Sequence, residues 1–394
     1  MSVLGTYDVV IIGGGACGGT TAMFLRRAGV SVALVDKSTI GTEASWASAG
    51  MVGRESCPQR DPWFLQATTL SSELYDGLDE QLFDLTGQHM GYGGEGHLLI
   101  ARGDDDTATL HERVDHQMKQ GVEIELLEGA EARRREPALP EDVTVAAWTP
   151  GGRYLDARRY TAAVAAAARQ LGADIHEGQA VNGLVWNGDR VIGVRCGSDE
   201  MHAATVINAA GAWAGRIDPR LTHPVFPLHG QIMSVAAPAC GLRHNVSRAD
   251  RWGYATPRPD GRVVVGATHD EWGYEKKITP EGMEYLGQIV QNVMPVLIGR
   301  PVLDIWSGLR PGTVDGLPTI GPDPRVSSGY LWAAGHSSSG MMQMPATAKV
   351  LVDLVQGEKP DPAIDQLRIE RYDDESYVQI AEPLRKIEGR YLSI

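Results

Sequence analysis

Three glycines near the start of the chain have the spacing that binds a dinucleotide. Gly13, Gly15 and Gly18 form a G-x-G-x-x-G pattern directly after the apolar run at 7–12. The first glycine permits a tight turn, the second lets the backbone approach a pyrophosphate, and the third lets a helix lie close on a strand. Free N–H groups at that helix N-terminus would hold the phosphates. Asp36 is placed to bind ribose hydroxyls, and its charge disfavours a 2′-phosphate.

The elements that must position these residues follow in the right order. The run at 7–12 predicts a buried strand. A helical pattern with Ala22, Leu25 and Ala28 on one face follows it and stops at Gly29, and 31–35 predicts a second strand that ends in Asp36. A lone glycine pattern is a weak signal in a chain with 47 glycines among 394 residues. A complete strand–helix–strand unit closed by an acid is a stronger one, and it predicts a dinucleotide-binding domain.

Length, charge and cysteine usage narrow the class of protein. The 394 residues predict two or three domains, and the net charge of −14 argues against nucleic acid or anionic membranes as partners. No apolar stretch reaches the length of a membrane span and the start lacks a signal-peptide pattern, so we expect a cytoplasmic protein. Cys17, Cys57, Cys196 and Cys240 have no C-x-x-C spacing, which indicates reduced thiols and no metal site.

The remainder of the chain predicts a second α/β unit and a sheet-rich segment. The small residues of 38–53 predict a loop that runs past the far end of the cofactor, and the leucines of 62–86 predict a helix with one buried face. Asp156 is a plausible N-cap for an alanine-rich helix, and 187–189 carries a hairpin turn signal. Residues 223–305 are typical of a sheet.

Six segments carry a resemblance to a known family. In chain order they are DVVIIGGGACGGTTA, ASWASAGMVG, VINAAGAWAG, YATPRPDGRVVVGAT, WSGLRPGTVDGLPTIG and WAAGHSSSGMMQMPATA. Together they resemble the D-amino acid oxidase superfamily of FAD enzymes, and in pattern the glycine oxidase branch. The resemblance implies a fold of the α/β plus α+β class, in which a Rossmann-like FAD-binding domain is interleaved with a sheet-rich substrate domain. We expect the FAD-binding domain at 1–85, 150–220 and 305–394, and the substrate domain at 86–149 and 221–304.

The resemblance also implies the residues that hold FAD. Backbone groups of 45–51 would hydrogen-bond the flavin, and the 335–342 loop would lie at the pyrimidine end of its ring, where a helix N-terminus stabilises negative charge. The candidate cofactor-binding residues are Gly13, Gly15, Ala16, Cys17, Gly18, Asp36, Lys37, Ser45, Ser48, Ala49, Gly50, Met51, Val181, Ala210, Gly211, Gly335, His336, Ser337, Ser338, Ser339, Gly340, Met341 and Met342. Relatives that bind flavin covalently use a cysteine in the C-terminal part. This chain has none after Cys240, so non-covalent FAD is expected.

Arg310 and Tyr254 are the candidate catalytic residues. By the resemblance, Arg310 binds the substrate carboxylate and Tyr254 helps to orient it. Arginine suits this role because its planar fork offers a carboxylate two parallel charge-assisted bonds. The alternatives are a surface salt bridge for Arg310 and an ordinary sheet position for Tyr254. His336 and Cys17 are interpreted as packed residues, His336 beside the flavin loop and Cys17 at the helix start.

The expected reaction is FAD-dependent oxidative deamination of a small amino acid: glycine, a D-amino acid or an N-substituted glycine. Hydride would pass from the α-carbon to flavin N5, and the resulting imine would hydrolyse to an oxo acid, so no base has to remove a carbon-bound proton. The family loop G-H-aromatic-R-N-G reads GHSSSG here. Ser338 therefore replaces an arginine, which removes a charge near the ring and weakens the case for glycine.

Other functions are separated by specific features. A disulfide reductase would need a second dinucleotide fingerprint and paired cysteines, and an aromatic hydroxylase would need an acidic residue at 333–336; this chain has neither. An FAD-dependent 2-hydroxy-acid dehydrogenase and a non-enzymatic flavin sensor stay open. The expected partner is an amino acid or related carboxylate substrate, with no nucleic acid and no membrane insertion, and a homo-oligomer is compatible with the sequence.

Overall fold

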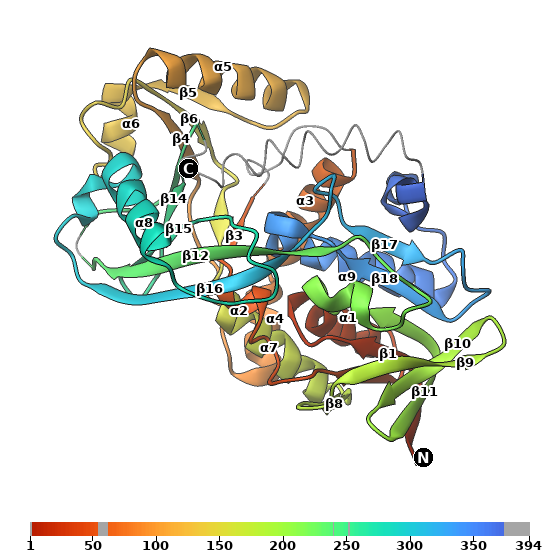
Figure 1. Cartoon of the computed structure of the whole chain (residues 1–394). Coiled ribbons are helices and arrows are strands. Elements are labelled where there is room, and N and C mark those ends of the chain that lie inside the picture. The colour runs from red at the N-terminus through yellow and green to blue at the C-terminus, as the bar shows by residue number, and fades with distance from the viewer. Residues whose placement is uncertain (1, 54–61, 239, 251–252, 374–394) are drawn as a thin grey trace.

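The computed structural model describes residues 2–53, 62–238, 240–250 and 253–373. Its strands form two eight-stranded sheets and one two-stranded pair. In Figure 1 the first sheet and its helices occupy one side of the molecule, and the second sheet with α5, α6 and α8 occupies the other. This arrangement matches the predicted combination of a Rossmann-like unit with a sheet-rich unit.

The first sheet contains the predicted strand–helix–strand unit. Its strands are β1 (Val3–Ile12), β2 (Val32–Val35), β8 (Asp174–His176), β9 (Val181–Asn187), β10 (Arg190–Cys196), β11 (Asp199–Asn208), β17 (Thr319–Pro322) and β18 (Tyr330–Ala334). The order is β17-β18-β11-β1-β2-β8, and the β9–β10 hairpin joins through β11. β1 lies in the middle and pairs in parallel with β2 and β11, so the carboxyl ends of these strands meet at one edge.

Five helices share an apolar core with this sheet. They are α1 (Ala16–Arg27), α3 (Pro62–Tyr75), α4 (Leu78–Thr86), α7 (Ala157–Gln170) and α9 (Gly340–Gln356). Asp156 caps α7 as predicted, because its carboxylate accepts the backbone N–H groups of Arg158 and Arg159. The leucines of 62–86 form two helices instead of one, because Gly77 adopts a φ of 82° between them.

The second sheet is long and twisted, and it is covered on both faces. Its strands are β4 (His97–Ala101), β5 (Glu125–Glu128), β6 (Val145–Thr149), β12 (Phe226–Ala236), β13 (Asn245–Arg248), β14 (Tyr254–Pro257), β15 (Arg262–Gly266) and β16 (Val302–Gly312). The order is β16-β12-β15-β14-β13-β4-β6-β5. Leu98 packs with the core that includes α8 (Pro280–Val293), whereas Leu99 packs with α5 (Asp104–Lys119). Neighbouring strand residues face opposite ways, so these two helices cover opposite faces.

The connections between the two sheets are more ordered than the sequence indicates. The stretch 38–53, expected as a loop, contains the short helix α2 (Ala44–Ala47) and the strand β3 (Met51–Val52), which pairs with β7 (Arg153–Tyr154). A further short helix, α6 (Gly129–Arg135), lies next to β5 and β6. The predicted domain boundary at 305 falls inside β16, which pairs along its length with β12. The division into domains stays a prediction.

The structure also bears on two expectations from composition. Within the described ranges, none of the helices combines the length and apolar character needed to cross a bilayer. Cys17, Cys196 and Cys240 are free thiols, and Cys57 lies outside the described residues.

Candidate active site

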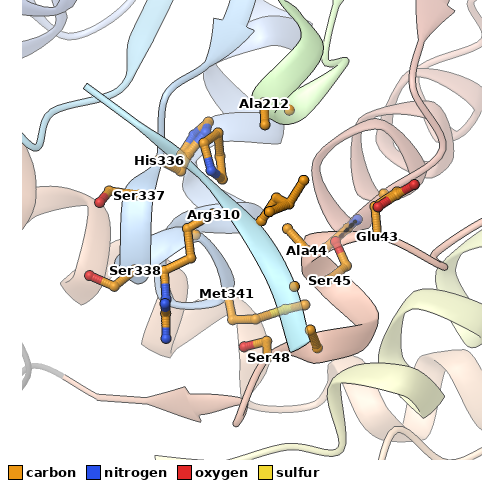
Figure 2. A pocket seen from close by; sticks show the side chains of 18 of the residues that line it. Glu43, Ala44, Ser45, Ser48, Ala212, Arg310, His336, Ser337, Ser338 and Met341 are labelled. Atoms are coloured by element: carbon orange, nitrogen blue, oxygen red, sulfur yellow. Dashed lines mark hydrogen bonds between the residues drawn. The ribbon is translucent and has the colours of Figure 1, made fainter. Parts of the chain in front are cut away.

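A cavity of about 600 Å³ is lined by residues of both sheets and of the segments between them (Figure 2). This volume is typical of a site for a cofactor or a drug-sized ligand. Twenty-one of the 23 candidate cofactor residues and both candidate catalytic residues line it; Gly18 and Gly335 do not. One cavity therefore gathers residues that lie more than 300 positions apart in the chain.

The glycine turn forms one end of the cavity. Gly13 has a φ of 101°, and a Cβ there would lie 2.5 Å from the Ala209 carbonyl oxygen, so only glycine fits. The N-terminus of α1 follows, and Gly15 and Ala16 line the cavity. No side chain caps this helix through its N-cap residue and its first turn carries no acid, so its N–H groups and positive dipole end suit an anion. Ser45 Oγ accepts the Ala16 N–H at 2.9 Å, which ties the turn to α2.

Asp36 lies where a ribose-binding acid is expected. Its Oδ2 accepts the Gly14 N–H at 2.7 Å and its Oδ1 accepts the Ser38 N–H at 2.8 Å. A carboxylate has about four acceptor positions, so these bonds fix its orientation and leave capacity for hydroxyl donors. Lys37 Nζ lies 3.2 Å from the Trp213 ring centroid and 3.3 Å from a Glu43 oxygen.

The two candidates outside the cavity wall have structural positions. A Cβ on Gly18 would lie 1.9 Å from the Gly13 carbonyl oxygen, so Gly18 allows α1 to pack on the turn. Gly335 has a φ of 82°, and a Cβ there would meet the Thr313 methyl group at 2.6 Å. Cys17 lines the cavity and is half-buried, and burial raises the pKa of its thiol to about 12. The thiol is therefore protonated and unreactive at neutral pH.

The segment 44–51 is held against the second sheet by three contacts. A Cβ on Gly308 would lie 2.4 Å from the Ala47 Cβ, so β16 has no side chain beneath α2. The Trp306 indole N–H donates to the Ala47 carbonyl at 3.2 Å, and the buried Arg258 guanidinium donates to the Ala49 carbonyl. These contacts fix a backbone whose residues face the cavity, as expected of a ring-binding segment.

Residues 336–342 of the second predicted flavin loop form another wall of the cavity. Ser337 has a φ of 47°, an uncommon value for a residue other than glycine. The N-terminus of α9 follows without a capping side-chain bond or an acid in its first turn, and Gly340 and Met341 line the cavity. Ser338 is exposed, and it lines the same cavity as Arg310 and Met341. His336 is buried and lies 3.1 Å from Thr347 Oγ1, and burial lowers its pKa to about 4.

Arg310 and Tyr254 extend toward each other across the face of the second sheet. A Cβ on Gly230 would lie 2.0 Å from Arg310 Nη1, and one on Gly266 would lie 2.6 Å from the Tyr254 hydroxyl. The guanidinium therefore lies over β12 and the phenol over β15, the strands between β16 and β14. Burial lowers the pKa of Arg310 and raises that of Tyr254, and each group partly opposes the effect on the other.

The Arg310 guanidinium is available to an anion. Its Nη1 donates to the Thr268 carbonyl at 3.3 Å, and within the described part of the chain no carboxylate lies at ion-pair distance from it. An arginine has five N–H donors, so this bond leaves most of its hydrogen-bonding capacity for a ligand in the cavity that it lines. Among the described residues, Arg310 forms no surface salt bridge, which was the alternative interpretation of this residue.

Several residues of the site were not found in the sequence. A glycine inside a strand indicates close approach of another group, so Gly230 and Gly308 carried a usable signal. His269 lines the cavity beside Arg310, and burial together with the Arg310 charge lowers its pKa well below the usual value. Neither His269 nor Arg258 belongs to a spacing pattern that sequence alone could single out.

The hydrogen-bonding groups and the accessible backbone of the cavity wall suit the parts of an FAD molecule. Two helix N-termini without first-turn acids, those of α1 and α9, face one cavity. Between them lie an oriented carboxylate, Asp36, and a stretch of accessible backbone at 44–51. This set suits a pyrophosphate at one end, a ribose beside it and an electron-accepting ring at the other end.

Comparison with known proteins agrees with this geometry. A family model described as "FAD dependent oxidoreductase" (DAO) matches residues 8–354. A glycine oxidase of Pseudomonas aeruginosa is 32% identical over 361 residues, covering 90% of this chain and 97% of that protein. Glycine oxidase from Geobacillus kaustophilus has a similar structure, with a TM-score of 0.87, 28% identity, and coverage of 92% of this chain and 98% of that one. Iminodiacetate oxidase from Chelativorans sp. BNC1 has a TM-score of 0.83, 27% identity, and coverage of 92% and 98%.

Proposed function

We propose that this chain, which belongs to the DAO family of FAD-dependent oxidoreductases, oxidises the C–N bond of glycine, a D-amino acid or an N-substituted glycine. The activities of its relatives support this class, since a glycine oxidase and an iminodiacetate oxidase are similar to it along nearly the whole chain. Ser338 replaces the arginine of the family loop, which weakens the case for glycine within this class of substrates.

One observation carries the proposal: the Arg310 guanidinium and the Tyr254 phenol converge over two glycines in the cofactor cavity. A carboxylate bound by Arg310 would receive parallel charge-assisted bonds, and Tyr254 would restrict its rotation. This grip would hold the α-carbon in one orientation, and positioning is the protein's main contribution when a cofactor performs the chemistry.

The chain offers a defined place for each part of the cofactor. We assign the pyrophosphate to the α1 N-terminus, the ribose to Asp36 and the ring to the walls formed by 44–51 and 335–342. When bound, FAD supplies the oxidant that takes a hydride from the substrate α-carbon at its N5. The α9 N-terminus would stabilise negative charge in this region.

The residues of the site have no need to remove a carbon-bound proton. The substrate amine must be uncharged, because its lone pair forms the imine, and water then converts the imine to an oxo acid and ammonia or a primary amine. His336 is a poor candidate for a base, since its buried imidazole is bonded to Thr347 and its pKa is lowered to about 4. This supports the interpretation that it packs beside the loop.

Anaerobic reduction of the bound flavin tests the function. We expect glycine, sarcosine, iminodiacetate or a D-amino acid to bleach the 450 nm band, with release of ammonia or a primary amine on turnover. Bleaching by 2-hydroxy acids alone would contradict the proposal and favour the dehydrogenase. No bleaching by either panel would favour a non-enzymatic flavin protein.

Three further expectations belong to the proposal. Acid precipitation should leave the flavin in the supernatant if FAD is bound without a covalent link, as the lack of a cysteine after Cys240 indicates. A cytoplasmic location and a homo-oligomeric assembly stay predictions from the sequence.

A further inference from the structure

The active-site cavity continues along the second sheet beyond Tyr254. Ser247 of β13 lies opposite Tyr254 of β14, so both side chains are on the same face of the sheet. β4 is the next strand, and its first residue, His97, lines the same cavity as Ser247. Strands are spaced about 4.8 Å apart, so the cavity continues for about 10 Å past Tyr254. We call this extension, which His97 and Ser247 line, the arm. The Tyr254 ring leans the other way, over Gly266.

Helix α5 supplies a cation at the end of this arm. Arg113 of α5 lines the cavity, and its Nη1 donates to the Ala249 carbonyl at 2.9 Å. Arg248 also lines the arm, but its Nη2 lies 2.5 Å from Asp106 and 2.6 Å from Asp250, so two carboxylates balance its charge. A guanidinium has five donors, so Arg113 can bind an anion while it keeps its protein contacts.

The acids of the cavity lie at the other end. Of the described residues that line it, Asp36 and Glu43 are the only carboxylates, and both belong to the nucleotide end. Asp106 and Asp250 are not part of the wall. An anion that enters the arm therefore faces arginine side chains and, among the described lining residues, no carboxylate.

A neutral polar pair completes the wall. His97 Nε2 lies 2.6 Å from Ser247 Oγ, and the His97 side chain is buried. Burial, and then the charge of Arg113, lower the pKa of His97 to about 3, so the imidazole is uncharged at neutral pH. The pair offers hydrogen bonds to a ligand beside Arg113 without adding a second charge.

We infer that Arg113, with the His97–Ser247 pair, binds a second carboxylate of a substrate whose first carboxylate is held by Arg310. The inference rests on the proposed function and narrows its substrate to a dicarboxylic amino or imino acid. The second carboxylate is carried on a short chain from the nitrogen or from the α-carbon. Glycine and sarcosine are too short to reach this arm.

Binding to the holoenzyme tests the subsite without turnover. Thioether acids lack the amine and are not oxidised, so (butylthio)acetate and 4-(carboxymethylthio)butanoate form a matched pair that differs in a terminal carboxylate. Changes in the flavin spectrum on titration give their Kd values. We expect the dicarboxylate to bind at least tenfold more tightly than the monocarboxylate. Equal affinities would overturn the inference.

Variants assign the difference to Arg113. Arg113→Gln should remove the preference for the dicarboxylate while the Kd of (butylthio)acetate changes less than about twofold, and Arg113→Lys should restore part of it. Lys119→Gln, which removes the same charge from an exposed position of α5, should keep the preference. Ser247→Ala should reduce it severalfold, and it provides a second test if Arg113→Gln does not fold. Retention of the full preference in both folded variants would overturn the inference.

Substrate panels separate the remaining outcomes. We expect kcat/KM to be higher for N-(3-carboxypropyl)glycine or for 2-aminoadipate than for N-butylglycine or norleucine, and the better pair shows whether nitrogen or the α-carbon carries the chain. Oxidation of all four at equal rates would overturn the subsite and leave the proposed function standing. A preference that disappears in 0.5 M salt would indicate steering instead of contact and would also overturn it.

Discussion

At the scale of single residues, the position of Arg310, the proposed clamp for the substrate carboxylate, depends on a glycine that lies beneath its guanidinium. Gly230 pairs with Gly308 in the middle of two long strands, and a Cβ on Gly230 would lie 2.0 Å from Arg310 Nη1. The guanidinium can lie flat on the sheet only because no side chain rises there. The identity of Arg310 supplies the charge, and the glycine beneath it determines where that charge lies.

Removing the charge should separate substrate binding from cofactor binding. We expect Arg310→Ala to raise the substrate KM about 100-fold, because a charge-assisted bidentate pair contributes roughly 2–3 kcal/mol. FAD content, measured from the ratio of absorbance at 450 and 280 nm, should stay near that of the wild type. Arg310→Lys should recover only part of the loss, because an ammonium lacks the planar fork. Normal kinetics in Arg310→Ala would show that the clamp is misassigned.

Displacing the charge should have a related effect. In Gly230→Ala the new methyl group meets the end of a flexible side chain, so the guanidinium moves and the sheet stays intact. We expect KM to rise about tenfold with a melting temperature close to that of the wild type. A large fall in melting temperature with unchanged KM would contradict this reading of the glycine.

Buried neutral histidines should make the fold sensitive to acid. The pKa of His223 is lowered to about 3, by burial first and then by Arg371 and Arg325. Its Nδ1 accepts the Val225 N–H at 2.9 Å, so protonation at Nδ1 breaks this bond. A pKa depressed on folding gives stability that is complete above the unfolded pKa near 6.5 and is lost as pH falls toward 3.

The pH dependence of unfolding measures this effect. By pH 5 the imidazole of His223 should cost about 2 kcal/mol relative to pH 7, from about 1.4 kcal/mol per pH unit. His223→Asn keeps an acceptor for Val225 and cannot be protonated, so its stability, though lower at pH 7, should fall less between pH 7 and 5. The exposed His111 offers a control substitution, His111→Asn. Equal pH slopes for the wild type and His223→Asn would refute the assignment.

At the scale of elements, the fit of α1 against the glycine turn decides whether its N-terminus reaches the cavity. Gly18 faces the Gly13 carbonyl so closely that a Cβ added to Gly18 would lie 1.9 Å from the carbonyl oxygen. The obstacle is backbone and cannot rotate away. A side chain here has to push α1 away from β1, and the N–H groups of the helix move with it.

A pair of glycine substitutions separates this close approach from helix propensity. Gly18→Ala should lower FAD occupancy and melting temperature together, because α1 shifts. Gly287→Ala lies inside α8, where a Cβ meets nothing within 4 Å, so it should raise stability by up to about 1 kcal/mol and leave FAD bound. Full FAD occupancy in Gly18→Ala would show that the turn tolerates a wider spacing.

The sequence predicts local elements well because their signals are local. The strand at 7–12, the glycine turn, α1 and Asp36 form a continuous stretch in which each residue type has one physical reason, and the structure agrees with it. Asp156 capped α7 as predicted for the same reason. The stretch 38–53 shows the limit, since α2 and β3 form there because β16 and β7 hold them.

At the scale of the whole molecule, the cavity depends on strand register between distant segments. His97 and Asn245 pair in register although 148 positions separate them, and α5 then brings Arg113 to the same wall. Neither the composition nor the spacing of residues along the chain predicts such a pairing. Sequence motifs and a family resemblance therefore pointed to Arg310 and Tyr254, while the arm beyond them became visible only in the assembled sheets.

The same assembly closes one end of the cofactor cavity. The segment after β15 returns from the second sheet to the nucleotide end, where the Tyr274 hydroxyl donates to the Ala212 carbonyl at 2.9 Å and its ring lies 4.0 Å from the Arg216 guanidinium. Lys276 Nζ lies 2.9 Å from Glu43. Glu43, Ala212 and Arg216 all line the cavity, so this segment reaches this end of the cavity from the opposite sheet.

This closure predicts that a tyrosine hydroxyl remote from the substrate sets the lifetime of bound FAD. Loss of one hydrogen bond costs about 1 kcal/mol, so Tyr274→Phe should speed FAD dissociation about fivefold, while KM at saturating FAD stays the same. Recovery of flavin fluorescence after dilution measures the rate. Tyr7→Phe removes a comparable bond, to Asp174 at 2.5 Å on the first sheet, and should leave dissociation unchanged. If both variants release FAD at the wild-type rate, the segment covers this end of the cavity without holding the cofactor, and retention must come from the other walls of the cavity.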